Sequence, residues 1–191
     1  MATPTLDSTV AGTAANSYVD LHFADDFFGD GLDGDDWLSF DVEDRTRALI
    51  SATARDKDSI DMVLRAHGGA WLKYDLVDPE QTLLFPQSGD FDDSGDLEII
   101  DEVEEGTCRL ALFLLKKRRG DFGPMDPGAM RDQGVMSVSS GGLSVSRGSA
   151  TWTNWPPDVK NLLMGFIQRG GRVMPGGSVR RRLWHEGWVG S

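Results

Sequence analysis

The sequence predicts a mainly α protein: a small helical bundle around a central buried helix, with a β-hairpin and an extended C-terminal arm. Three observations lead to this prediction. Apolar residues recur at helical spacing between residues 100 and 115, and four positive charges follow where a helix dipole favours them. Serines alternate with apolar residues on both sides of Ser140-Gly-Gly142, a pattern typical of a hairpin. Residues 172–191 combine glycines and arginines in a way that cannot form a core.

The first third of the chain predicts two helices after a flexible or extended lead at residues 1–16. A short helix is expected from about Leu21 to Phe28, capped by Asp20, and the Gly/Asp-rich residues 29–36 are expected to be a loop. Asp41 is expected to cap a longer helix that is interrupted near residues 56–59 and ended by Gly68-Gly69. The inner face of this helix is predicted to carry Leu49, Ala52, Thr53, Ile60, Val63 and Leu64.

The central helix is predicted to start at a cap on Asp101, with Glu104 completing a capping box. Its apolar surface extends almost all the way round, so it needs neighbours on several sides. Cys108 lies within this surface and is expected to be a small buried hydrophobe rather than a catalytic thiol. As the single cysteine, it can form no internal disulfide.

Beyond the central helix, a loop and the hairpin lead to a last helix that starts at Pro156-Pro157. The apolar stripe of this helix is expected to pack on the chain's own core; it comprises Val159, Leu162, Leu163, Phe166 and Ile167. The predicted organisation is a lead at 1–16, a helical bundle core at 17–119, a loop, hairpin and C-terminal helix at 120–171, and a basic, tryptophan-containing arm at 172–191.

Charge is divided unevenly along the chain, whose net charge is −12. Residues 1–105 hold 26 acidic and 6 basic side chains, whereas residues 106–191 hold 5 acidic and 13 basic ones. One interpretation is ordinary solubility with a basic tail. The other is self-assembly, in which the basic arm of one subunit lies on an acidic face of another or of a partner.

Arginine and tryptophan, the residues most enriched at binding hot spots, cluster near the C-terminus. The alternative is a disordered tail with incidental aromatic residues. The candidate partner-binding residues are Trp152, Trp155, Arg180, Arg181, Arg182, Trp184 and Trp188.

A calcium loop is a weaker hypothesis for the acidic stretch that precedes the central helix. Oxygen ligands would come from Asp90, Asp92, Ser94, Asp96 and Asp101, with a glycine at the sixth place. The twelfth place holds aspartate rather than the longer glutamate, and Pro86 and Gly89 forbid an entering helix, so a solvated acidic loop is the preferred interpretation.

Catalysis is not indicated. His22, His67 and His185 lie in different segments without metal-ligand spacing, and the chain has no Walker loop or dinucleotide fingerprint. We therefore expect neither an enzyme nor a bound cofactor. No signal peptide or membrane-spanning stretch is evident either.

Several short motifs occur in the order found in the head–tail connector, or adaptor, proteins of tailed bacteriophages, a group often labelled DnaT-like single-stranded-DNA-binding proteins. The sequence resembles that family over residues 11–118, and more weakly to about residue 169. Asp101 stands where the family has a proline. The motifs are Ala15-Asn16-Ser17-Tyr18-Val19-Asp20, Ala48-Leu49-Ile50-Ser51-Ala52-Thr53, Ile60-Asp61, Gln81 to Pro86, and Val103 with the run 107–112.

The resemblance implies a structural virion protein in the neck of the particle, made in the cytoplasm of the bacterial host. It would form a homo-oligomeric ring, expected to be twelvefold, between the portal protein and a downstream tail or stopper protein. Double-stranded DNA would pass through without specific binding, because acidic walls repel phosphate. The alternative function is single-stranded-DNA binding, which requires a basic groove with stacking aromatic residues.

Overall fold

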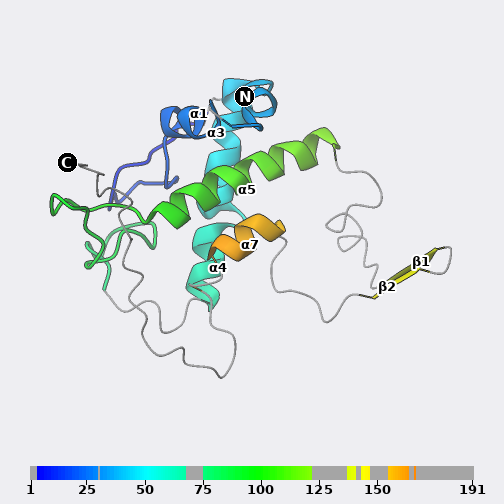
Figure 1. Ribbon diagram of the computed structural model, residues 1–191. Helices are drawn as coiled ribbons and strands as arrows, with labels where there is room; N and C mark the ends of the chain where they lie inside the picture. Colours follow the sequence, from blue (N-terminus) through cyan, green and yellow to red (C-terminus); the bar gives the residue numbers. More distant parts are fainter. Residues whose placement is uncertain are drawn as a thin grey trace, which may run out of the picture.

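The computed structural model describes residues 4–29, 31–67, 75–121, 137–140, 143–146, 155–163 and 166. This part of the chain is mainly helical, as predicted, and its helices gather round the long helix α5 (Figure 1). In chain order the elements are α1 (Leu21–Gly29), α2 (Gly34–Leu38), α3 (Val42–Ile50), the π-helical η1 (Ser51–Arg55), α4 (Ile60–His67), α5 (Asp101–Arg119), β1 (Ser137–Ser140), β2 (Leu143–Ser146) and α7 (Pro157–Leu163).

The central position of α5 is confirmed by its neighbours. It contacts α1, α3, η1, α4 and α7, which together surround much of its length. Val103, Cys108 and Ala111 on α5 have no exposed surface. The prediction that Cys108 is a buried small hydrophobe is therefore correct, and burial raises the pKa of its thiol far above the ordinary value.

The predicted start of α5 is wrong by one residue. Ile100 occupies the N-cap position, where its carbonyl accepts the backbone N–H groups of Val103 at 2.8 Å and Glu104 at 3.2 Å, and no side chain caps the helix. Asp101 instead becomes the first helical residue, where its negative charge still suits the helix dipole. The capping box with Glu104 does not form.

The cap of α1 is as predicted, but the loop expected at residues 29–36 contains the start of another helix. Asp20 accepts the backbone N–H of Phe23 at 2.7 Å. The short helix α2 begins at Gly34, where a Cβ would lie only 2.7 Å from the carbonyl oxygen of Phe28. Burial of Trp37, whose ring lies 4.9 Å from that of Phe28, outweighs the poor helix propensity of glycine and aspartate.

The predicted second helix is divided into three parts. Asp41 takes the N-cap position of α3, although its side chain makes no cap hydrogen bond. The helix widens into the π-turn η1, and extended backbone at Asp56 then separates η1 from α4, as expected for the interruption near residues 56–59. The predicted inner face is confirmed, since all six of its residues are buried. Gly68-Gly69 lies outside the described residues, as does the side chain of His67.

Helix α7 packs on the chain's own core, as predicted. Val159 and Leu163 are fully buried, and α7 approaches α5 at Gly106, where an added Cβ would lie 3.2 Å from Leu163 Cδ1. Phe166, just beyond α7, lies edge-on to Phe85 with the ring centroids 6.0 Å apart. Ile167 lies outside the described part.

Strands β1 and β2 pair with each other in antiparallel fashion, with Ser137 opposite Ser146 and Ser140 opposite Leu143. Among the described residues, no helix is both long enough and apolar enough to cross a membrane.

The N-terminal lead, expected to be flexible or extended, is anchored from residue 4 onward. The Asn16 side chain donates to the Thr5 carbonyl and accepts the Asp7 N–H, both at 2.9 Å, which closes a loop. Thr82 then joins the end of this loop to the bundle, since its hydroxyl donates to the Thr13 carbonyl at 2.6 Å. These hydrogen bonds supply a local order that the small polar composition did not indicate.

Candidate interaction site

A buried polar junction joins three of the sequence motifs at Asp61 on α4. The Tyr18 hydroxyl donates to Asp61 Oδ1 at 2.7 Å, and the backbone N–H of Leu84 donates to the same oxygen at 2.6 Å. Arg65, one turn further along α4, donates to Asp61 Oδ2 at 2.6 Å. Tyr18 and Asp61 are only 1% and 4% exposed, so no bulk water competes with these bonds.

The remaining motif side chains extend the same junction. The backbone N–H of Tyr18 donates to the Thr53 hydroxyl at 3.3 Å, and Gln81 Nε2 donates to the carbonyls of Leu83 and Pro86. The Phe85–Pro86 peptide bond is cis. Segments distant in sequence are thus fixed to one another by polar contacts with defined geometry, which packing of apolar side chains alone would not specify.

Trp155, one of the predicted partner-binding residues, lies inside the fold. It is 3% exposed, and its indole N–H donates to the backbone carbonyl of Asp58. The indole closes the junction between α7 and the loop after η1, so Trp155 packs within the fold rather than projecting from it, and its part in partner binding stays a prediction. The other six candidates lie outside the described residues: Trp152, Arg180, Arg181, Arg182, Trp184 and Trp188.

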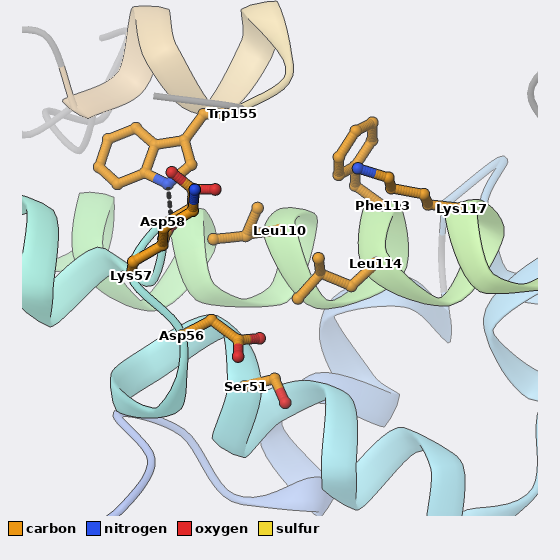
Figure 2. Close-up of a pocket in the computed structure, with 9 residues that line it drawn as sticks. All are labelled: Ser51, Asp56, Lys57, Asp58, Leu110, Phe113, Leu114, Lys117 and Trp155. Carbon is orange, nitrogen blue, oxygen red and sulfur yellow. Dashed lines mark hydrogen bonds between the residues drawn. The ribbon is translucent and has the colours of Figure 1, made fainter. Parts of the chain in front are cut away.

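A pocket of about 220 Å³ lies beside Trp155, between α5 and the turn at η1 (Figure 2). Its apolar wall comes from α5, where residues spaced as i, i+3 and i+4 lie on one face. Its polar rim comes from η1 and the loop that follows. The lining residues are Leu110, Phe113, Leu114 and Lys117 on α5, Ser51, Asp56, Lys57 and Asp58 on the other side, and Trp155.

No pattern in the sequence predicted this pocket. Ser51, the first residue of the π-turn η1, contributes to its rim, and such turns occur frequently at functional sites. The apolar spacing of Leu110 and Leu114 predicted burial of that face of α5, and Leu114 is in fact only partly buried.

The positive end of α5 is neutralised by acidic residues just before and within α2. Lys116 lies 2.9 Å from Asp33 and 2.8 Å from Asp36, and Arg119 lies 3.1 Å from Asp36. These cations lower the pKa of the Asp36 carboxyl through hydrogen bonds and charge. The arginine side chains elsewhere in the described bundle are also largely paired, as Arg45–Asp25, Arg47–Glu43, Arg65–Asp61, Arg109–Glu105 and Arg118–Asp44.

The candidate calcium loop uses its own oxygens for internal hydrogen bonds. Asp92 Oδ1 accepts the backbone N–H groups of Ser94 and Asp96, both at 2.8 Å, and Asp90 accepts the N–H of Gln87. Asp101 belongs to the first turn of α5. Within the described ranges, no three carboxylate, histidine or cysteine side chains are grouped in a way that could hold a metal ion.

Carboxylates also gather at the start of α5. Glu104 is partly buried, and burial together with Asp101, Glu98 and Asp20 raises its pKa from 4.5 to about 7. The Glu104 carboxyl group therefore titrates near neutral pH. His22, by contrast, is exposed and lies 2.9 Å from Asp26, one helical turn away.

Comparison with models of protein families, with curated proteins and with solved structures gives no match for this chain.

Proposed function

We propose that this protein is a head–tail connector subunit of a tailed bacteriophage. It is a structural protein of the virion neck that forms a ring between the portal and the tail components and surrounds the DNA passage. Copies pack side by side through a cyclic interface, and the family resemblance leads us to expect twelve of them. It performs no chemical reaction and needs no cofactor; its activity is assembly.

The observation that carries this proposal is the junction at Asp61. Tyr18, Asp61 and Leu84 come from three separate motifs of the connector resemblance, yet their side chains and backbone meet within hydrogen-bond distance. All three motifs therefore contribute to one buried junction, as a shared scaffold would require. The convergence supports a common scaffold, and the function follows from that scaffold by analogy.

The charge of the described bundle is consistent with a channel through which DNA passes without binding to the wall. Acidic residues outnumber basic ones more than fourfold in residues 1–105, and Lys116, Arg118 and Arg119 near the end of α5 are held in ion pairs. Such a surface repels the phosphates of duplex DNA, so the genome can pass without sticking. We propose that the arm at 172–191 reaches a neighbouring ring and contributes to the attachment.

Single-stranded-DNA binding is the second candidate, and the described bundle gives it less support. That function needs a basic groove with exposed aromatic platforms. Most cations of the bundle are paired with carboxylates, and Trp37 and Trp155 are buried. Fluorescence anisotropy with a labelled oligonucleotide at low salt separates the two functions: tight binding that weakens steeply with salt would favour this candidate.

Co-sedimentation with purified portal rings tests the connector function. The full chain is compared with a variant that ends at residue 171, and circular dichroism verifies that both retain the helical bundle. We expect the full chain to sediment with portal rings and the shortened variant to sediment at least tenfold less. If both chains sediment equally with the portal rings, the arm has no part in attachment. If neither chain sediments with the rings, the connector function itself is contradicted.

A further inference from the structure

We draw no further inference here: the strongest candidate, the pocket of about 220 Å³ beside Trp155 between α5 and η1, has a rim on which Asp56 and Asp58 offset Lys57 and Lys117, so nothing in the structure shows what covers it.

Discussion

Replacing Tyr18 with phenylalanine removes one oxygen atom from the Asp61 junction and leaves the aromatic ring in place. The hydroxyl donates to Asp61 Oδ1 at 2.7 Å, and burial with the nearby Asp61 charge raises the pKa of Tyr18 well above 10.0, so the phenol remains a donor. After the substitution the carboxylate keeps the donors from Leu84 and Arg65 but loses one of three. The contact of the Tyr18 ring with Phe85 should survive.

The size of the effect follows from the burial of both partners. A hydrogen bond to a charged group contributes about 1.5–3 kcal/mol, and water cannot replace it here because Asp61 is 4% exposed. We expect Y18F to lower the free energy of unfolding by about 2 kcal/mol. For a chain of this length that corresponds to a fall in Tm of about 4–8 °C.

Urea unfolding followed by tryptophan fluorescence and circular dichroism measures this loss. S94A is the matched control, because it also removes one hydroxyl but from an exposed loop, and it should change stability by less than about 0.5 kcal/mol. A double-mutant cycle with D61N isolates the Tyr18–Asp61 term. A loss below about 0.5 kcal/mol for Y18F, with an unchanged m-value, would refute the role of this junction.

Three further perturbations test other parts of the bundle. The raised pKa of Glu104, about 7 against an ordinary 4.5, means that the folded state retains a proton that the unfolded state loses, so stability should fall as pH rises from about 4.5 to 7. E104Q should remove this dependence of the free energy of unfolding on pH. At pH 8 the variant should be more stable than the natural chain by about 1 kcal/mol, after allowance for solvent screening. Equal stability of the two chains at pH 8 would contradict the raised pKa of Glu104. G106V should destabilise by about 1–3 kcal/mol in thermal unfolding, because the close approach of Leu163 leaves no room for the side chain, whereas a neutral result would argue against the α5–α7 packing. W155A should lower the free energy of unfolding in urea by about 3–5 kcal/mol. A decrease below about 1 kcal/mol would contradict the burial of the Trp155 side chain.

Helical periodicity predicted most of the bundle because burial follows it closely. The inner-face residues of α3, η1 and α4, the burial of Cys108 and the docking of α7 were all predicted from spacing alone. The cap on Asp20 was predicted from the same local chemistry that forms it. At α5 the same rule predicted Asp101 as the N-cap residue. Asp101 is instead the first helical residue, and no side chain caps this helix.

The misses share a physical cause, which is tertiary contact outweighing local preference. A Gly/Asp-rich segment predicted a loop, but Trp37 makes its end a helix by packing against Phe28. Trp155 was predicted by residue type to contact a partner, whereas in the fold the carbonyl of Asp58, 97 residues away in sequence, accepts its indole N–H. No local pattern encodes the π-turn at Ser51–Arg55, so the pocket could not be predicted.

The central claim is assembly with a portal, and the mass of the complex tests it most directly. Multi-angle light scattering at moderate salt measures the chain of 20.9 kDa alone and after mixing with portal rings. The connector function predicts that the portal gains a fixed multiple of that mass, twelve copies being expected from the resemblance. A chain that remains at 20.9 kDa beside an unchanged portal, while its mass increases on single-stranded DNA, would contradict the account.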